Sequence, residues 1–449
     1  MAETMHEDTV FRPKPSLPPP PNTVGVVGWL RKNLFGGPFD SILTIVGGSL
    51  IAYFAYTLYL YGIANAVWSA GSYRECLDIT RGNGACWAGV SVWMNNYFYG
   101  RYPDVEQWRV NLAGVILAVW LAPFWFPKVK AKIATGISAV LTYPFLAAAM
   151  LLGGEVGWFL QIMVGIALTA FAAVWLNVAA SYAGYGSLRA ALMRLSGFEN
   201  KDERLQKYVL IGAFAVGFVL ALLFQATWDL APVPTVNWGG LFLTLVISGI
   251  AISSALPTGV ILALGRRSKM PVIRVFCTAF IELFRSVPLI TILFMAVTMM
   301  PLFLPVEVNL DKLVLVIIAV CIFAAAYMAE IVRGGLQAIN KGQYEAAQAM
   351  GLNYWKMMTL IIMPQALKLM IPNIVGNFIG LLKDTTLVSI IGLYDILLMA
   401  KASGQDTKWL GMHTEPFLFT AAVFFVICFC MSKYSQHLER TIGGGYGRR

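Results

Sequence analysis

Polar side chains that could carry chemistry stand inside long apolar stretches of this 449-residue sequence. Tyr327, Glu330 and Arg333 follow one another at spacings of three residues, which on an α-helix form one polar ridge. Ionisable groups at membrane depth are costly and usually face a bundle interior or a water-filled path. The ridge is therefore either an ion pair that sets a helix end or part of a gate in a solute pathway.

A second ionisable pair, Glu282 and Arg285, also has a spacing of three residues. The two side chains share a helix face and can pair. Pro288 follows three residues later and is expected to bend the helix or weaken its hydrogen bonding. We expect an ion pair near the cytoplasmic interface rather than a substrate contact.

A polar stripe follows further along the chain, at offsets of 0, 4, 7 and 11 residues: Asn373, Asn377, Gly380 and Asp384. On an α-helix these positions share one face. Asparagine side chains join helices in membranes, and the pair Gly376 and Gly380 permits close helix approach. The stripe predicts a helix–helix seam, a pathway lining, or both at a dimer interface.

The run Lys383, Asp384, Thr385 and Thr386 interrupts an apolar stretch near the middle of an expected membrane span. A lysine and an aspartate at that depth must be neutralised locally or hydrated. One interpretation is a structural ion pair. The other is a transport site, because broken helices near the membrane midplane mark such sites.

No arrangement in the sequence predicts catalysis, metal binding or a bound cofactor. There is no G-x-x-x-x-G-K-[ST] P-loop, so ATP binding by that motif is not expected. The three histidines, His6, His413 and His437, form no cluster with cysteines at metal-ligand spacing. Energy-coupled transport would therefore need ATP and Mg on a separate ATPase.

The segment Lys341–Pro364 is a polar amphipathic stretch between apolar runs. Its notable residues are Glu345, Ala346, Ala347, Gly351, Ile361 and Pro364. Alanines favour a helix, and Gly351 suits a helix C-terminus or a sharp turn. The segment therefore predicts a short helix outside the bilayer, then a turn, then a helix that re-enters the membrane.

Composition places the chain in the membrane class. It is 58% hydrophobic and 12% charged, whereas soluble domains carry about 25% charged residues. The net charge of +10 does not indicate nucleic acid, because Lys and Arg collect in the cytoplasmic loops of membrane proteins and no loop pairs a basic run with interleaved aromatics. We predict an all-α polytopic membrane protein surrounded by lipids.

About ten apolar runs are long enough to cross a bilayer, and about eight to ten is the expected number of membrane helices. The runs are approximately 39–63, 109–127, 133–152, 156–179, 208–228, 240–265, 275–300, 313–334, 366–399 and 416–433. The ninth run is too long for one simple helix and is expected to be broken. The seventh and eighth apolar runs, 275–300 and 313–334, come before the Lys341–Pro364 segment in the chain.

Basic residues in the short loops predict the orientation, because Lys and Arg concentrate on the cytoplasmic side. They occur in alternate loops, on the same side as Arg31 and Lys32 and as the C-terminal arginines. Both termini are therefore expected in the cytoplasm, and Lys341–Pro364 faces the same compartment.

We expect four regions along the chain. Residues 1–38 form a proline-rich cytoplasmic arm with an interfacial anchor at Trp29–Lys32. Residues 39–230 hold accessory membrane helices and an outer loop at 64–108. Residues 235–434 hold the polar intramembrane features, and residues 435–449 form a cytoplasmic tail. Cys76 and Cys86 lie in the outer loop, where a disulfide can persist; the sequence leaves their pairing open.

Three blocks of sequence together resemble the permeases of polar amino-acid ABC importers. They are ELFRSVPLITILF (282–294), AYMAEIVRGGLQAINKGQYEAAQAMGL (326–352) and IIMPQALKLMIPNIVGNFIGLLKDTTLVSIIGL (361–393). The resemblance covers roughly 240–433, and the proline-rich arm and extra N-terminal spans are similar to the large permeases of general L-amino-acid systems. It departs from the family pattern mildly, at Ser286, Met363 and Thr386.

The resemblance implies a five-helix type I ABC importer permease core in a bacterial inner membrane. It implies a second homologous permease, two ATPase subunits that dock on the segment around Glu345, and a periplasmic binding protein that delivers an L-amino acid. On this reading the candidate pathway residues are Tyr327, Glu330, Asn373, Asn377, Lys383, Asp384, Thr385 and Thr386. The chain itself is then not an enzyme.

Two other functions fit part of the pattern. A secondary transporter or channel that acts alone would explain the intramembrane charges but not the Lys341–Pro364 segment. A membrane scaffold would tolerate replacement of Lys383 or Asp384.

Overall fold

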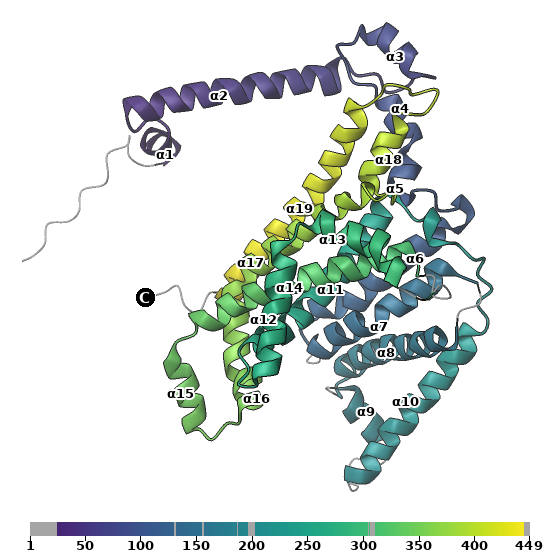
Figure 1. Ribbon diagram of the computed structural model, residues 1–449, viewed down its shortest axis with the longest axis vertical. Helices are drawn as coiled ribbons and strands as arrows, with labels where there is room; N and C mark the ends of the chain where they lie inside the picture. Colours follow the sequence, from purple (N-terminus) through teal and green to yellow (C-terminus); the bar gives the residue numbers. More distant parts are fainter. Residues whose placement is uncertain are drawn as a thin grey trace, which may run out of the picture. The chain divides into compact units, whose positions relative to one another are not determined.

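The computed structural model describes residues 25–129, 132–154, 157–185, 187–195, 203–303, 305 and 310–443. Residues 1–24 of the expected N-terminal arm at 1–38 and the last residues of the expected tail lie outside these ranges. Within them the protein is built from helices, and the extended pairings are isolated bridges. Figure 1 shows the helices in chain order.

Two compact units divide the chain, Met1–Ala88 and Gly89–Arg449. The first contains α1 (Gly25–Asn33), the long α2 (Pro38–Tyr59), which continues as a π-helical turn to Ala64, and α3 (Tyr73–Thr80). Cys76 and Cys86 form a disulfide in this unit, so the structure joins the two cysteines whose pairing the sequence left open. Trp87 stacks on Trp68 and donates its indole N–H to the Gly62 carbonyl at 2.7 Å.

The second unit begins with an accessory bundle. Its helices are α5 (Met94–Tyr99), α6 (Gln107–Leu121), α7 (Lys132–Leu152), α8 (Trp158–Tyr182), α9 (Leu188–Leu195) and α10 (Glu203–Gln225). α6 packs on α7, α7 on α8, and α8 on α10. Short helices, including α3, α5 and α4 (Trp87–Val92), occupy much of the expected outer loop at 64–108.

A buried arginine ties the accessory bundle to the connection that leads into the rest of the unit. Arg109 is 1% exposed, and its Nη2 lies 2.7 Å from a Glu106 carboxylate oxygen. Its Nη1 donates to the Ala231 carbonyl at 2.7 Å. The nearby Tyr102 hydroxyl donates to the Leu151 carbonyl at 2.9 Å. These bonds hold three chain segments together at one end of the bundle.

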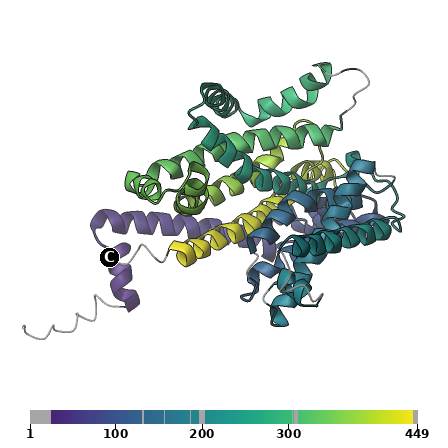
Figure 2. The same cartoon turned by 90° about the horizontal axis from the view of Figure 1, so that it is seen from below.

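The remaining helices form a core around α11 (Gly240–Arg266) and α14 (Lys312–Ala338). The others are α12 (Pro271–Ser286), α13 (Leu289–Phe294), α15 (Lys341–Ala349), α16 (Tyr354–Met357), α17 (Met363–Asp384), α18 (Ile396–Ser403) and α19 (Thr414–Gly443). α11 packs along α14, α14 against α17, and α17 against α19, as the two views show (Figures 1 and 2). The α11–α14 approach is close: a Cβ added at Gly259 would lie 2.6 Å from Met328 Cγ.

The short helix α5 inserts into the core at the end where α11 begins. Tyr97 is fully buried, and its hydroxyl donates to Ser403 Oγ on α18 at 2.8 Å. Gly100 lies against the backbone of Gly239, where an added Cβ would approach Gly239 Cα to 2.2 Å. The accessory half therefore supplies part of the packing around α18.

Nine of the described helical segments are long and apolar enough to cross a membrane, and a bent pair raises the number to ten. This confirms the predicted class and helix number. α7 and α8 are separate helices on either side of Gly153, which has a φ of +60°. The expected seventh span is the bent pair: α12 and the helix after it meet at 105°, with Pro288 at the start of α13.

The ninth expected span differs from the prediction. The helical segment runs from Tyr354 to Ser389, and the chain then breaks before α18. Lys383 and Asp384 therefore lie near the end of this segment, where α17 passes into a 3-10 turn, and not near its middle. The sequence suggested a central break because the apolar residues of α18 made the apolar run continue past Ser389. Lys383 and Asp384 therefore stood near the middle of that run.

Candidate functional site

The segment Lys341–Pro364 forms a helix, a turn and a second helix. The Asn340 side chain caps α15 by accepting a hydrogen bond from Gly342 N at 2.9 Å. Gly351 ends the helix with a φ of +75°, in the left-handed region that favours glycine. Asn353 then caps α16, and Pro364 stands at the start of α17, directly after the π-helical turn Met358–Ile362.

One face of α15 is fixed to the core. Ala347 is buried with Met357, Met358 and Ile362 in the cluster that includes Val332 and Leu336 of α14. The Tyr344 hydroxyl donates to the Leu336 carbonyl at 3.2 Å. The other face is uncovered by the described residues: Glu345 and Ala346 are exposed, and Met350 is 79% exposed. The helix therefore presents a surface while remaining attached beneath.

Arg267, at the end of α11, joins the attachment of α15. Its Nη1 donates to the Tyr344 hydroxyl at 3.2 Å, and its guanidinium lies 5.6 Å from the centre of the Tyr344 ring. Gln365 of α17 donates to the side chain of Gln343 at 3.2 Å. These contacts were not predicted from the sequence, although Tyr344 stands three residues before Ala347, a spacing that places both on one helix face.

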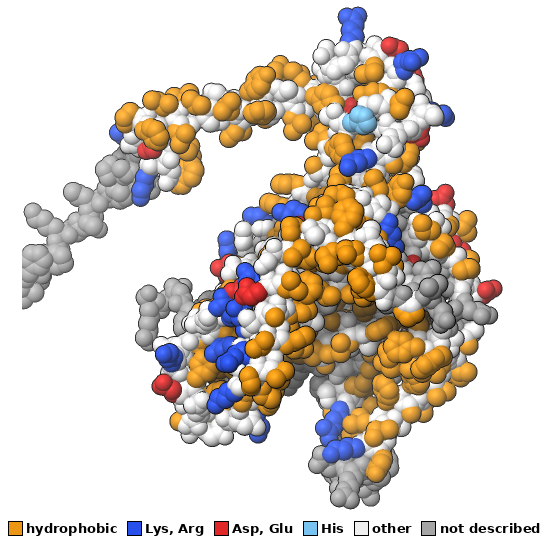
Figure 3. Space-filling model, viewed as in Figure 1, with side chains coloured by type: hydrophobic (Ala, Val, Ile, Leu, Met, Phe, Trp, Pro, Cys, Tyr) orange, Lys and Arg blue, Asp and Glu red, His pale blue; other side chains and the backbone are white. Residues whose placement is uncertain are grey.

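Basic side chains gather around this part of the surface. Figure 3 shows Lys and Arg side chains over the region where Figure 1 places α15 and α16. The large exposed side chains there include Trp355, at 65% exposure. Exposed aromatic and methionine side chains beside charge are typical of protein interfaces.

The acidic and basic residues of α11, α12 and α14 form one cluster around Glu330. Arg333 pairs with Glu330 through a bidentate contact. Arg285 Nη1 and Arg266 Nη1 lie 3.4 Å and 3.5 Å from Glu330 Oε2. Tyr327 donates to the Arg285 carbonyl at 3.5 Å. The cluster connects the ends of three helices.

Glu282 pairs differently from the expectation. Its Oε1 lies 2.8 Å from Arg266 Nη2 on α11, while Arg285 turns to Glu330 on α14. The two residues are close on one helix, but each of them pairs with a residue of opposite charge on a neighbouring helix. The packing of α11, α12 and α14 decides which charged residues pair, so the spacing of three residues within α12 could not predict these pairs.

The polar stripe of α17 is only partly covered by other residues within the described chain. A Cβ added at Gly376 or Gly380 would meet nothing within 4 Å. Asn373 is exposed, and the buried Asn377 Oδ1 has no hydrogen-bond partner within the described residues. Neither Lys383 nor Asp384 forms an ion pair in that part of the chain. The hydroxyls of the neighbouring Thr385 and Thr386 donate hydrogen bonds to the backbone carbonyls of Leu382 and Lys383, respectively.

The structure does not bring all the candidate residues into one site. Gly335 of α14 packs on Ala366 and Met370 of α17, which places the Glu330 cluster beside the first half of α17. Asp384 lies 11 residues after Asn373, about 16 Å farther along the helix. The candidates therefore form a line between the two ends of α17. No group of three or more potential metal ligands occurs among the described residues.

Comparison with known proteins identifies the family. Residues 255–444 match the family described as "Binding-protein-dependent transport system inner membrane component". The chain is 40% identical to the glutamate/glutamine/aspartate/asparagine transport system permease protein BztC of Rhodobacter capsulatus, over 95% of both chains. It is 37% identical to the inner membrane amino-acid ABC transporter permease protein YhdY of Escherichia coli K12, over 96% of this chain and 97% of that one.

A shorter relative matches less of the chain. The probable glutamine ABC transporter permease protein GlnP of Bacillus subtilis is 35% identical over 45% of this chain and 91% of its own length. Full-length similarity is thus found with BztC and YhdY, and part-length similarity with GlnP. The chain belongs to the family of amino-acid ABC transporter permeases, multi-pass proteins of the bacterial inner membrane.

Proposed function

We propose that this chain is the permease subunit of an ATP-driven importer of polar L-amino acids. It pairs with a second homologous permease, receives substrate from a periplasmic binding protein, and is driven by two ATPase subunits that carry ATP and Mg. The glutamate, glutamine, aspartate and asparagine named for BztC give the substrate class. The chain itself catalyses no reaction.

The observation that supports this function best is the two-sided character of α15. Its exposed face, with Glu345, Ala346 and Met350, is available to an ATPase. Tyr344 on its attached side is bonded to Leu336 of α14 and to Arg267 at the end of α11, and the exposed Gln343 is bonded to Gln365 of α17. A displacement of α15 would therefore reach the helices that carry the Glu330 cluster and the polar stripe.

The polar stripe of α17 supports a pathway between two permeases. Its amides, its aspartate and its adjacent lysine have few partners within the described chain, and its glycines leave space beside the helix. Polar groups near a membrane path can bind the ammonium and carboxylate groups of an amino acid. Asn373, Asn377, Lys383 and Asp384 contact substrate in this proposal, and Tyr327 and Glu330 lie farther toward the coupling helix.

The decisive experiment purifies the tagged full chain in mild detergent and identifies its companions. We expect an ATPase and a second permease, and ATP-dependent uptake of glutamate or glutamine when the complex and its binding protein are reconstituted. A chain that purifies alone and transports in liposomes without ATP would overturn the proposal and favour a secondary transporter.

Two variants test the coupling surface. Glu345→Lys reverses a charge on the exposed face, and we expect ATP-driven uptake to fall by at least about tenfold while membrane insertion is retained. Gly351→Val forces a β-branched residue to a φ of +75° and should have a similar effect. Gly342→Ala is the matched control, because that glycine has no left-handed φ. Normal uptake by both test variants would contradict the docking of an ATPase on α15.

A further inference from the structure

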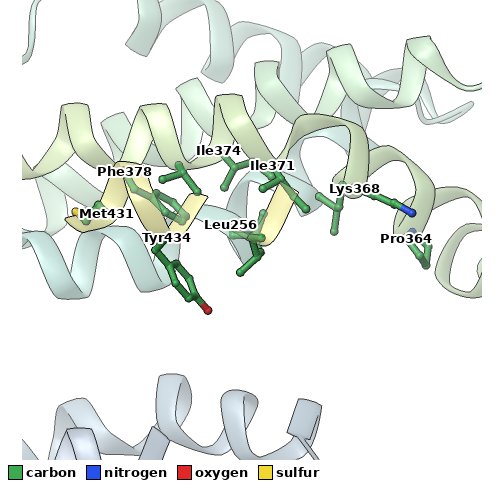
Figure 4. Close-up of a pocket in the computed structure, with 11 residues that line it drawn as sticks. Leu256, Pro364, Lys368, Ile371, Ile374, Phe378, Met431 and Tyr434 are labelled. Carbon is green, nitrogen blue, oxygen red and sulfur yellow. The ribbon is translucent and has the colours of Figure 1, made fainter. Parts of the chain in front are cut away.

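An apolar groove runs along the surface between α17 and α19, with α11 beneath it. Its volume is about 470 Å³, and Figure 4 shows its lining side chains in a row from Pro364 and Lys368 to Met431 and Tyr434. Nearly all of the lining is aliphatic or aromatic. The polar exceptions are the Lys368 ammonium group and the Tyr434 hydroxyl.

The groove is distinct from the polar stripe of α17. Leu367, Ile371, Ile374 and Phe378 line the groove at spacings of four, three and four residues. This row lies roughly 120° around the helix from the row that begins at Asn373, at 100° per residue. The groove therefore faces a different environment from the pathway candidates, and an occupant of one does not fill the other.

The basic end of the groove lies close to Lys341–Pro364, the proposed coupling segment. Lys368 is in the second turn of α17, which starts at Met363 directly after the α15–α16 region. On the proposed orientation, Lys368 stands at the depth of the inner lipid headgroups. Its ammonium group has no ion pair or hydrogen bond in the described part of the chain, and no acidic residue lines the groove. The charge at this end is therefore complementary to an anion.

The length of the groove matches one leaflet. Lys368 and Phe378 are ten residues apart, about 15 Å along the helix. The hydrocarbon core of a bilayer is about 30 Å thick, so one leaflet supplies acyl chain over about half of that distance. A lysine side chain whose stem lies on an apolar surface is typical of the membrane interface.

We propose that the groove binds an anionic phospholipid of the inner leaflet. Its phosphate pairs with Lys368, and an acyl chain lies on Ile371, Ile374 and Phe378 toward Met431. Only the inner-leaflet assignment rests on the proposed function, through the orientation of α15. Because the headgroup would sit beside the start of α17, the lipid would hold that helix against α19 just behind the coupling segment.

The test measures lipid retention and does not use transport. The purified full chain is exchanged into nanodiscs with equal amounts of phosphatidylglycerol and phosphatidylcholine, then released into detergent, and the lipids that remain bound are counted by native mass spectrometry. We expect about fivefold enrichment of phosphatidylglycerol, the value that one basic group at an anionic surface supports. Equal retention of the two lipids by the unmodified chain would overturn the proposal.

Three variants locate the site. Lys368→Glu should abolish the enrichment, and Ile371→Trp, which fills the groove, should reduce the number of retained lipids. Lys433→Glu is the matched control, because Lys433 is an exposed lysine of α19 that lies over Phe429 and does not line the groove. Enrichment that survives Lys368→Glu, or that disappears in Lys433→Glu, would overturn the assignment.

The same variants separate the lipid from a protein occupant. If a second permease covers the groove, Ile371→Trp should prevent co-purification of that permease while lipid retention is unchanged, which would overturn the lipid proposal. The retention assay needs no ATPase. Loss of lipid binding with intact ATP-driven uptake would refute only the proposal that the groove binds lipid. Failure of the ATPase to co-purify, with intact enrichment of phosphatidylglycerol, would refute only the proposed transport function.

Discussion

The accessory helix α10 and the core helix α14 are almost equally apolar, yet they are packed very differently. The mean hydropathy of their most apolar windows is 2.2 and 2.5, but 6% of the window is buried in α10 and 56% in α14. α10 contacts α8 and α9, whereas α14 lies among α11, α12, α13 and α17. Hydropathy thus places both helices in the membrane, while position in the bundle decides which one carries a polar cluster.

One charged group of the accessory bundle contrasts with two polar groups of the core. Arg109 is bonded through both terminal nitrogens, to Glu106 and to the Ala231 carbonyl, although its Nε has no partner among the described residues. Asn377 and Asp384 in the core lack comparable partners. A satisfied buried group stabilises a fold, whereas an unsatisfied one is costly unless a ligand or a partner completes it. We therefore expect accessory substitutions to change stability and stripe substitutions to change transport.

The largest expected effect is a loss of transport when residues of the polar stripe of α17 are replaced. Asp384→Asn and Asn377→Leu should each lower ATP-driven uptake by at least about tenfold, while the midpoint of thermal unfolding of the purified chain stays the same or rises. Leucine at 377 removes an unpartnered buried oxygen whose burial costs about 1–3 kcal/mol. Uptake in proteoliposomes and unfolding in detergent provide the two readouts. Normal uptake with a lower unfolding temperature would show that the stripe is a structural seam.

The next largest effect is on stability, from the accessory bundle. Arg109→Met should lower the free energy of unfolding by about 3 kcal/mol, because it leaves the Glu106 carboxylate and the Ala231 carbonyl without their partner. Chemical denaturation of the purified chain measures the loss. Arg101→Met is the control: Arg101 is exposed above the Tyr394 ring, and its cation–π contact contributes only about 0.5–1 kcal/mol. Equal losses in the two variants would contradict the special role of Arg109.

A pH dependence should come from Asp395, which lies between the spans that end at Ser389 and begin at Thr414. Burial raises the pKa of this carboxyl to about 7, although it caps α18 by accepting from Leu398 N. The folded protein therefore holds a proton that the unfolded chain, with a pKa near 3.9, releases earlier. Stability falls as pH rises from about 4 to about 7, and between pH 5 and pH 7 the loss is about 2–3 kcal/mol.

The measurement for Asp395 is the unfolding midpoint across pH 5 to 8. Asp395→Asn keeps an oxygen for the cap but removes the titration, so its unfolding should be nearly independent of pH in this range. A variant with the same slope as the unmodified chain would assign the pH dependence to another group.

The smallest expected effect concerns the cap of α15. Asn340→Ala removes the acceptor for Gly342 N and should destabilise the first turn by about 1 kcal/mol. Amide hydrogen exchange in residues 341–349 should become faster, and the affinity for the ATPase should fall slightly. Gln337→Ala, on the exposed end of α14, is the control. Unchanged exchange in the Asn340 variant would show that tertiary contacts alone hold the helix.

Much of the architecture was predictable because it depends on local rules. Long apolar runs predicted the membrane helices, Pro288 predicted a bend between α12 and α13, and Gly351 predicted the turn after α15. Each of these outcomes follows from the chemistry of one residue type or one window of sequence. The Lys341–Pro364 segment was recognisable for the same reason, since its helix, turn and second helix are encoded within about 25 residues.

The pairing of charges was not predictable, because it depends on which helices become neighbours. Glu282 exchanges its nearby arginine for Arg266 of α11, and Tyr344 gains Arg267 from the same helix end. The depth of Lys383 and Asp384 was misjudged because hydropathy alone does not show where a helix stops and a separate short one begins.

The insertion of α5 into the core also sets a condition on biogenesis. Tyr97 and its hydrogen-bond partner Ser403 are 306 residues apart in the chain. At a synthesis rate of about 5–20 residues per second, Tyr97 leaves the ribosome roughly 15–60 s before Ser403 exists. During that interval the accessory helices are synthesised before the core helices, and the place that α5 will occupy is completed only when α18 has been made. The early half of the protein must therefore persist as an incomplete intermediate that the last two helices close.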